Sequence, residues 1–255
     1  MLRTFMISSL LLLLGACSSP EPADQYEAAV FNPQRPSQDT KQDTKRQPAA
    51  VLRYLAIKPG MTIADIKGGD GYYAELFNYL VAPEGKVYLH NFPTYIDKHS
   101  EALDQRMDNH RLANVQLVTG NTNDFNLPEP VDLIFLSQVF HDLYLQLDSL
   151  HDRALRSNFF NQLKVNLKPD GKVVVIDHAA PAGSEHYLTG KLHRIDAKYV
   201  EQQFVDNGFE MVSSSNILAN PDDPLKVDIW DSQVKGKTHR FIFVFQIKKD
   251  PIPEG

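Results

Sequence analysis

The chain has 255 residues, a formal net charge of −6 at pH 7 and a hydrophobic share of 42%. The mildly acidic balance, without a basic run that contains interleaved aromatic residues, argues against a nucleic-acid partner. Cys17 is the only cysteine, which excludes an internal disulfide.

The chain begins with an apolar segment that ends at this cysteine. Residues 1–16 carry Arg3 and a leucine run far shorter than the roughly 20 residues that span a bilayer, and they predict a signal peptide. The "LGAC" sequence at residues 14–17 resembles a bacterial lipobox, which implies acylation of Cys17 and a membrane anchor. Ser18, where an aspartate would retain the protein at the inner membrane, implies the periplasmic face of the outer membrane. The alternative is an ordinary cleavage site beside an unmodified cysteine.

A polar segment follows the signal peptide. Residues 17–46 are rich in Pro, Gln, Asp, Thr and Lys, a composition that buries too little surface to fold alone and predicts a flexible tether. Residues 47–250, about 200 residues, are enough for one sizeable domain.

A repeated pattern of helix, turn and strand fills this domain. Three helical stretches end in the turns "KPG", "APEG" and "KPDG", and each turn precedes an apolar run typical of a strand. Strands that alternate with helices predict a parallel sheet covered on both faces. We expect strands near residues 61–66, 86–90, 115–118, 131–136, 172–177, 209–214 and 239–247. We expect helices near residues 48–56, 72–81, 96–109, 152–167 and 196–206.

The last strand departs from the alternation. Residues 239–247 follow the preceding strand without a helix, after a long polar excursion over residues 215–238. This order predicts an antiparallel pairing at the edge of the sheet. The "VDLIFL" and "KVVVID" runs, in contrast, are nearly all apolar, as expected for central strands buried on both faces.

Polar residues come directly after the predicted strands. Ligands of open α/β sheets bind outside the carboxyl ends of the strands, so we expect the functional site at these positions. In chain order they are Asp65 with the glycines after it, His90 and Asn91, Gly120 and Asn121, Ser137 and Gln138, His141 and Asp142, and Asp177 and His178.

The strand order, the glycines after Asp65 and "LKPDGKVVVID" at residues 167–177 together resemble the class I S-adenosylmethionine-dependent methyltransferases. The segments "DGYYAELF", "FHDLY", "DHAAPAGS", "LHRID" and "KGKTHRFIFVF" look like a family of bacterial predicted methyltransferases, several of them exported. The resemblance covers about residues 47–248. It implies an α/β, three-layer Rossmann-like fold, whose seven-stranded, mostly parallel sheet has an antiparallel C-terminal edge strand. It also implies S-adenosylmethionine as the cofactor.

The loop after the first strand contains most of the cofactor-binding residues that the resemblance implies, namely Asp65, Gly68, Gly69 and Gly71. Glycines let the backbone approach a ligand, and the following helix offers free amide groups to an anionic group. Lys67 stands where methyltransferases usually have the first glycine of this loop. It blocks the cofactor if that glycine makes the contact, and it leaves the site intact if Gly68 takes over. The alternative is a tight turn without a ligand.

Three further residues complete the implied cofactor site. Asn91 ends the second strand, where many class I methyltransferases have an acidic residue that accepts hydrogen bonds from the ribose; an amide can accept one bond and donate another. Asn121, or alternatively Asp124, is placed to meet the adenine amino group, and Ser137 ends the fourth strand. Lys67 and Asn91 both predict weaker cofactor binding than is usual in this class.

Histidines near the strand ends are candidates for catalysis. Methyl transfer to oxygen or nitrogen needs an oriented nucleophile and often a base, and a neutral histidine can accept a proton near pH 7. His141 and Asp142 follow the fourth strand, His178 follows the fifth, and His193 lies in "LHRID". Each histidine could instead bond to the backbone and fix a loop. The four residues could also hold zinc or iron, but no short ligand spacing supports a metal, and we expect none.

A basic stretch leads into the last strand and includes its first residues. It contains Lys235, Lys237, His239 and Arg240, and it forms either a solvated hairpin face or a surface that attracts an anionic substrate.

Three hypotheses about function remain open. The first is an envelope lipoprotein that uses S-adenosylmethionine to methylate a small molecule or an envelope component. Lys67 and Asn91 favour the second, a non-catalytic ligand-binding lipoprotein on a degenerate methyltransferase fold. The third, a dinucleotide-dependent oxidoreductase, is weaker because the second strand has no acidic terminus.

Overall fold

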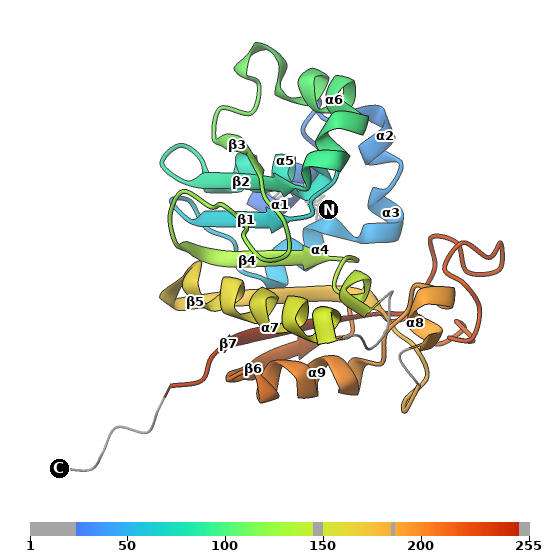
Figure 1. Cartoon of the computed structure of the whole chain (residues 1–255). Coiled ribbons are helices and arrows are strands. Elements are labelled where there is room, and N and C mark those ends of the chain that lie inside the picture. Colours follow the sequence, from blue (N-terminus) through green and yellow to red (C-terminus); the bar gives the residue numbers. More distant parts are fainter. Residues whose placement is uncertain (1–23, 145–149, 185–186, 250–255) are drawn as a thin grey trace, which may run out of the picture.

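Seven strands form one sheet in the order β3-β2-β1-β4-β5-β7-β6 (Figure 1). The computed structural model of the chain describes residues 24–144, 150–184 and 187–249. Six strands run parallel, and β7 is antiparallel to its neighbours β5 and β6. The strands are β1 (Thr62–Ile66), β2 (Lys86–Asn91), β3 (Val115–Thr119), β4 (Val131–Ser137), β5 (Leu167–His178), β6 (Phe209–Ser215) and β7 (Arg240–Ile247).

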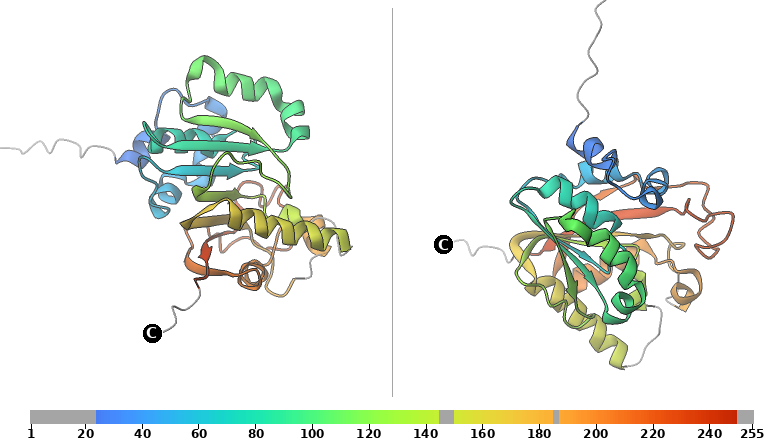
Figure 2. Two further views of the ribbon diagram at one scale, coloured as in Figure 1. Left: turned by 60° about the vertical axis from the view of Figure 1, so that its left-hand side comes forward. Right: turned by 90° about the horizontal axis from the view of Figure 1, so that it is seen from above.

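Helices cover both faces of the sheet (Figure 2). Helices α1, α4, α5 and α6 pack on one face, and α7 and α9 pack on the other. Within the described residues, no helix is long and apolar enough to cross a membrane. The helices are α1 (Gln25–Val30), α2 (Ser37–Thr40), α3 (Asp43–Arg46), α4 (Pro48–Tyr54), α5 (Tyr72–Val81), α6 (Pro93–Met107), α7 (Leu150–Val165), α8 (Tyr187–Leu192) and α9 (Ala197–Asp206), with 3₁₀ helices η1 (Asp108–His110) and η2 (His141–Tyr144).

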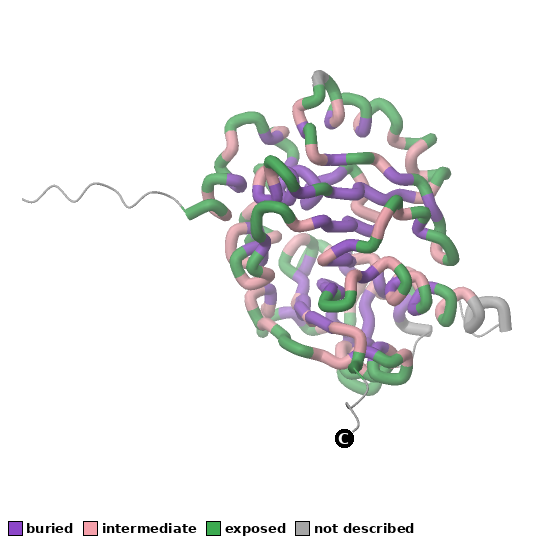
Figure 3. The backbone as a smooth tube through the Cα atoms, turned by 90° about the vertical axis from the view of Figure 1, so that its left-hand side faces the viewer, coloured by how far each residue is buried: buried purple, intermediate pink, exposed green. Residues whose placement is uncertain are grey.

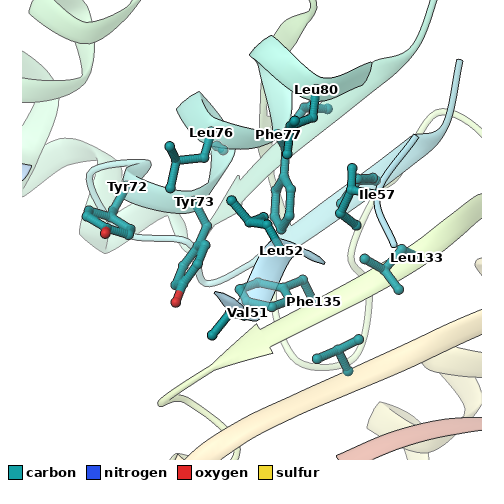
Figure 4. Packing of buried hydrophobic residues seen from close by; sticks show 14 of the residues in the cluster. Val51, Leu52, Ile57, Tyr72, Tyr73, Leu76, Phe77, Leu80, Leu133 and Phe135 are labelled. Atoms are coloured by element: carbon teal, nitrogen blue, oxygen red, sulfur yellow. The ribbon is translucent and has the colours of Figure 1, made fainter. Parts of the chain in front are cut away.

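The hydrophobic core has two layers, one on each face of the sheet. Successive side chains of a strand point to opposite faces, so in β4 Leu133 and Phe135 join the layer of α4 and α5, whereas Ile134 and Leu136 join that of α7. Figure 4 shows Phe77 of α5 against Phe135, with the ring centres 5.1 Å apart. The strands are therefore buried along most of their length, while the outer turns of the helices are exposed (Figure 3).

The predicted fold class is confirmed, and each of the seven strands overlaps its predicted range. The β5 strand begins at Leu167 rather than near residue 172, so the predicted "KPDG" turn at residues 168–171 lies within the strand. One detail of the strand order differs, because β7 lies between β5 and β6 and leaves β6 at the edge. The side chains agree with this order: Ile242 and Phe245 of β7 are fully buried, whereas Ser213 and Ser214 of β6 are exposed. An inner strand needs apolar side chains on both faces, and an edge strand does not.

The prediction of a flexible tether over residues 17–46 is wrong for residues 24–46. These residues form α1, α2 and α3, and Ala29 and Val30 are buried against the layer that contains α4 and α5. Asp24 caps α1, its carboxylate accepting hydrogen bonds from two backbone amides. Residues 1–23, which include the predicted signal peptide and the rest of the tether, lie outside the described residues.

The polar composition of this segment was misleading because its charges are paired with partners. Arg35 donates to Asp43 at 2.8 and 2.9 Å, and Asp39 accepts from Arg106 of α6 at 2.9 Å. Arg35, Asp39 and Arg106 are all buried. A segment rich in charge can thus order itself when the rest of the domain supplies the opposite charges.

Glu75 of α5 lies at the centre of this charged cluster. Its carboxylate, with 0% of the side chain exposed, accepts hydrogen bonds from Arg106 at 2.6 Å, Arg111 at 2.9 Å and Tyr79 at 2.7 Å. Arg106 also holds Asp39, so one buried network joins the N-terminal segment, α5 and the end of α6.

Candidate active site

The loop between β1 and α5, residues 67–71, is tightly wound and is called the glycine loop below. Lys67, Gly69 and Gly71 adopt left-handed backbone angles, with φ of 54°, 61° and 84°. A Cβ atom on Gly68 would lie 2.7 Å from the Asp65 carboxyl group, so a larger residue would clash there. The loop therefore needs glycine at positions 68, 69 and 71, whereas position 67 accommodates a lysine.

Asn91, at the end of β2, holds the glycine loop in place. The Gly69 amide donates to Asn91 Oδ1 at 3.0 Å, and Asn91 Nδ2 donates to the Gly69 carbonyl at 2.8 Å. An aspartate could accept the first bond but could not donate the second, which explains the amide at this position. Asn91 is buried, lines a cavity on the other side of the loop, and keeps one acceptor and one donor position of its amide beyond the two bonds to Gly69.

A cavity of about 580 Å³, the loop cavity, lies over the glycine loop at the carboxyl ends of β1 and β4. Asp65 and Ser137 line it, and Asp65 Oδ2 and Ser137 Oγ are buried without a hydrogen-bond partner among the described residues. Burial raises the pKa of Asp65 to about 7, against the lowering effect of the Arg46 guanidinium. Unpartnered buried polar atoms are costly, so these two oxygens suit a ligand that brings hydrogen-bond donors.

The N-terminal helices form the roof of the loop cavity. Figure 1 shows α2 and α3 beyond the arrowheads of β1 and β2, and Gln38, Gln42 and Arg46 line the cavity from these helices and the link between them. The Arg46 guanidinium lies over the Tyr72 and Tyr73 rings, 4.6 and 5.7 Å from their centres. The segment predicted to be a tether thus completes the site.

The Lys67 side chain lines the loop cavity and reaches from the glycine loop to η2. Its ammonium pairs with Asp142 and lies 5.2 Å from the centre of the Phe92 ring. Beyond this pair lie a second cavity of about 580 Å³, lined by Asn91 and Phe92, and a smaller one of about 80 Å³. The smaller cavity, called the apolar recess, is lined mainly by Ile66, Phe92, Phe125, Leu136, Val139, Leu143 and Phe159.

The Lys67–Asp142 ion pair therefore stands between the loop cavity and the apolar recess. Lys67 lines both cavities, and Asp142 lines the recess. A ligand that filled both spaces would pass this pair. The pair is about a quarter exposed, so its side chains can swing toward solvent.

His141 lies between two carboxylates. Its Nδ1 is 2.8 Å from Asp177 Oδ1, its backbone amide donates to Asp177 Oδ2 at 2.8 Å, and its Nε2 is 3.3 Å from Asp142 Oδ1. Burial opposes a charge on the ring, but the Asp177 carboxylate prevails and holds the pKa of His141 above its usual value. Asp177, His141, Asp142 and Lys67 thus form one chain of alternating charge.

The other two predicted histidines surround His141. The His178 and His193 rings lie 6.2 and 5.9 Å from the His141 ring, centre to centre. Burial lowers the pKa of His178 to about 3, and its Nδ1 lies 2.7 Å from Thr238 Oγ1. His193 Nδ1 lies 3.3 Å from Asp228. The structure therefore brings the four residues suggested for catalysis to one place.

Asn121, predicted to bind the cofactor, lines none of the three cavities described above. Its side chain is exposed and accepts hydrogen bonds from the backbone of Asn123 and Asp124, so it closes its own turn. Thr122 and Phe125 of the same loop line the apolar recess instead. Among the described residues, no group of three or more His, Cys, Asp or Glu side chains is arranged to hold a metal ion.

Sequence reasoning missed two contributors to the site. Arg46 was assigned to the tether, one residue before the predicted start of the domain and two residues before Pro48, where α4 begins. Asp177 was recognised as a polar strand end but was given no role. Its pairing with His141 bridges 36 residues of sequence, and no local pattern predicts it.

Comparison with known proteins identifies the family. A model of the O-methyltransferase domain matches residues 24–208. The match begins where the described helices begin, which agrees with an ordered N-terminal segment. The chain is also 26% identical over 195 residues to the ubiquinone/menaquinone biosynthesis C-methyltransferase UbiE of Shewanella frigidimarina, covering 66% of this chain and 73% of that protein. The UbiE protein of Shewanella sp. MR-4 is 27% identical over the same shares.

Solved structures show the same fold. A SAM-dependent methyltransferase from Aquifex aeolicus superposes with a TM-score of 0.56 at 20% identity, over 83% of this chain and 98% of that one. The glycopeptide N-methyltransferase MtfA, solved with sinefungin, gives a TM-score of 0.55 at 12% identity, over 82% and 87% of the two chains. Since the family model spans most of its length, the chain belongs to the O-methyltransferase domain family, within the predicted superfamily of class I S-adenosylmethionine-dependent methyltransferases.

Proposed function

We propose that the protein is an S-adenosylmethionine-dependent methyltransferase of the cell envelope that methylates a hydroxyl group of a small molecule. The observation that carries this proposal is the loop cavity, where buried oxygens of Asp65 and Ser137 have no partner among the described residues. The amino acid end of the cofactor has the donors that these oxygens need. The apolar recess beside the cavity, with Phe92 and Phe125 in its wall, suits the flat adenine ring of the cofactor.

The cofactor, when bound, supplies a methyl group that the sulfonium charge makes electrophilic. The protein then has to orient the acceptor and receive its proton. His178 stays neutral at physiological pH because its pKa is about 3, so it can accept a hydrogen bond from a hydroxyl group but holds a proton poorly. His141, which Asp177 orients and whose pKa is raised, is the better holder of that proton. We assign orientation to His178 and proton acceptance to His141.

The Lys67–Asp142 pair favours a second candidate function, a non-catalytic binding protein. If the pair stays closed, the loop cavity and the apolar recess cannot hold one ligand together. Affinity for the cofactor with methyl consumption would mark an enzyme, and affinity without turnover would mark a binding protein.

Lys67→Gly is expected to bind S-adenosylhomocysteine about tenfold more tightly than the wild type, because it removes the obstructing pair and relieves a strained left-handed residue. Isothermal titration calorimetry measures both affinities, and an assay of methyl transfer from S-adenosylmethionine follows. Lys67→Arg, which keeps a cation opposite Asp142, is the control and should stay within about threefold of the wild type. Equal affinities for wild type and Lys67→Gly would show that the pair does not obstruct, and binding by neither would refute the proposed cofactor.

The envelope location is also a proposal. It is supported by the predicted lipobox, and the ordered domain starts soon after it: seven chain steps separate Cys17 from Asp24, a reach of at most about 25 Å. Such a short link would hold the domain close to the membrane. Cys17→Ser should move the protein from the membrane fraction to the soluble fraction, as followed by fractionation and immunoblotting. An unchanged membrane fraction would contradict lipidation at Cys17.

A further inference from the structure

Another cavity, on the side of the loop cavity that faces Gln138 and Arg46, has a basic lining. It has a volume of about 260 Å³, and Gln42, Arg46 and Gln138 line both cavities. Its remaining wall comes mainly from the polar excursion before β7 and from His178, the last residue of β5. Figure 1 shows this excursion at the same end of the strands as α3. We call it the basic cavity.

Four cationic side chains line the basic cavity: Lys45, Arg46, Lys235 and Arg240. No carboxylate lines it among the described residues, and the ion pairs found in that part of the chain include none of the four. The whole chain carries a net charge of −6, so this concentration of positive charge is local. Arg46 interacts with the Asp65 carboxyl group of the adjacent loop cavity, and the other three cations have no carboxylate partner among the described residues. Cations gathered around one cavity attract an anion.

Arg240 is the strongest indication that the basic cavity binds an anion. It is only 7% exposed, one guanidinium nitrogen donates to the Lys45 carbonyl, and Nε is buried without a partner among the described residues. A buried guanidinium without a counter-charge is costly, and an anionic group would offset this cost through charge-assisted hydrogen bonds. Arg46 is close enough to oppose the charge on Arg240, so one anion could neutralise both.

Trp230 gives the basic cavity an apolar side. It is 64% exposed and lines the cavity, and Lys235 Nζ lies 5.9 Å from the centre of its ring. An exposed indole beside a cation offers a flat surface on which a ring can stack. An aromatic acid or phosphate combines the two groups that this cavity accepts.

We infer that the basic cavity binds the methyl acceptor by a carboxylate or phosphate group held at Arg240 and Lys235, with a planar part of the acceptor against Trp230. This inference rests on the proposed function, for which it names the acceptor class. The basic stretch that leads into the last strand is thereby divided: Lys235 and Arg240 line the cavity, whereas Lys237 does not. His178, in the same wall, then lies beside the bound acceptor.

Trp230 is the only tryptophan of the chain, and it lines the basic cavity. Fluorescence that is excited at the long-wavelength edge of tryptophan absorption, where tyrosine does not absorb, therefore reports on this cavity. Benzoate and phenyl phosphate are the anionic probes, and benzamide is the neutral control, all at constant ionic strength. We expect both anions to change the Trp230 fluorescence saturably and benzamide to bind at least about tenfold more weakly. Equal affinities for benzoate and benzamide, or no anion binding up to about 10 mM, would overturn the inference.

Charge variants and the cofactor product locate the binding. Lys235→Glu, an exposed position that should not disturb folding, and Arg240→Met are each expected to weaken benzoate binding about tenfold or more. Lys58→Glu, an exposed lysine outside the cavity, should stay within about twofold. Retained affinity for Lys235→Glu would contradict the site even if Arg240→Met does not fold.

Saturating S-adenosylhomocysteine separates an acceptor from the carboxylate of the cofactor. We expect benzoate to bind equally well in its presence, because the loop cavity and the basic cavity are adjacent but distinct. Displacement of benzoate would assign the cations to the cofactor carboxylate and overturn the inference. Benzoate binding together with no binding of S-adenosylhomocysteine in calorimetry would refute the proposed function and the acceptor role, while leaving the anion site in place.

Discussion

Glu75→Ala is expected to lower the free energy of unfolding by about 3–5 kcal/mol, because removing one partner leaves buried charges uncompensated. Arg106, with 3% of its side chain exposed, would lose the carboxylate 2.6 Å away and keep only Asp39. Arg111 and Tyr79 would lose their bonds to the same group. Urea denaturation at pH 7, followed by far-ultraviolet circular dichroism, measures the loss.

The expected dependence on pH follows from the same contacts. Burial opposes ionisation of Glu75, but hydrogen bonds from Arg111 and Tyr79 prevail and hold its pKa below the usual value. A carboxyl group with a lowered pKa in the folded state contributes stability above its unfolded pKa and loses it as the pH falls through the folded one. The difference between wild type and Glu75→Ala should therefore shrink below about pH 4.

Two comparisons decide whether buried charge is the cause. Glu84→Ala, at an exposed turn, should change the free energy of unfolding by less than about 0.5 kcal/mol. Adding Arg111→Met to Glu75→Ala removes a stranded cation whose carboxylate partner is Glu75, and it should recover part of the loss, while Arg106 keeps its pair with Asp39. A loss below about 1 kcal/mol for Glu75→Ala would show that the network contributes little.

The sheet was predictable because its signals are local. A Pro-Gly segment follows each of three helices, and the apolar runs of β4 and β5 are typical of central strands, so element type and order follow from patterns a few residues long. Helices α1, α2 and α3 were not predictable in this way. They have six, four and four residues, too short to be stable alone, and they depend on partners such as Arg106 that lie far along the chain.

The candidate site, too, was predictable where its signals are local and not where it depends on residues far along the chain. The rule that ligands bind at the carboxyl ends of strands pointed to Asp65 and Ser137, both of which line the loop cavity, because it depends only on strand boundaries. It could not predict that Lys67 reaches Asp142, 75 residues away, or that the Asn91 amide bonds to Gly69. Those contacts depend on side-chain direction, which the strand pattern does not fix.

Asp65→Asn is expected to weaken S-adenosylhomocysteine binding at pH 8 by about ten- to hundredfold, the effect of losing a charged hydrogen-bond acceptor. Asp65 lines the loop cavity with one oxygen unpartnered among the described residues, and its pKa is about 7. The ligand ammonium group favours the ionised carboxylate. Wild-type affinity should therefore rise by up to about tenfold per unit as the pH increases toward 7, and then level off. Calorimetry from pH 5.5 to 8.5 should show this slope for the wild type and a flat profile for Asp65→Asn.

The free energy of unfolding of Asp65→Asn distinguishes a ligand-binding role of Asp65 from a purely structural one. The folded pKa of Asp65 lies above its unfolded value of 3.8, so its ionisation costs stability as the pH rises toward 7, and Asp65→Asn should make the ligand-free protein more stable at pH 8. Asp70→Asn, in the same loop but about half exposed, should change neither property by more than about twofold in affinity or 0.5 kcal/mol. 5′-Methylthioadenosine, which lacks the ammonium group, should bind without the pH slope. A variant that is less stable at pH 8 and binds normally would make Asp65 a structural residue, whereas weaker binding with greater stability is what a buried charge kept for a ligand produces.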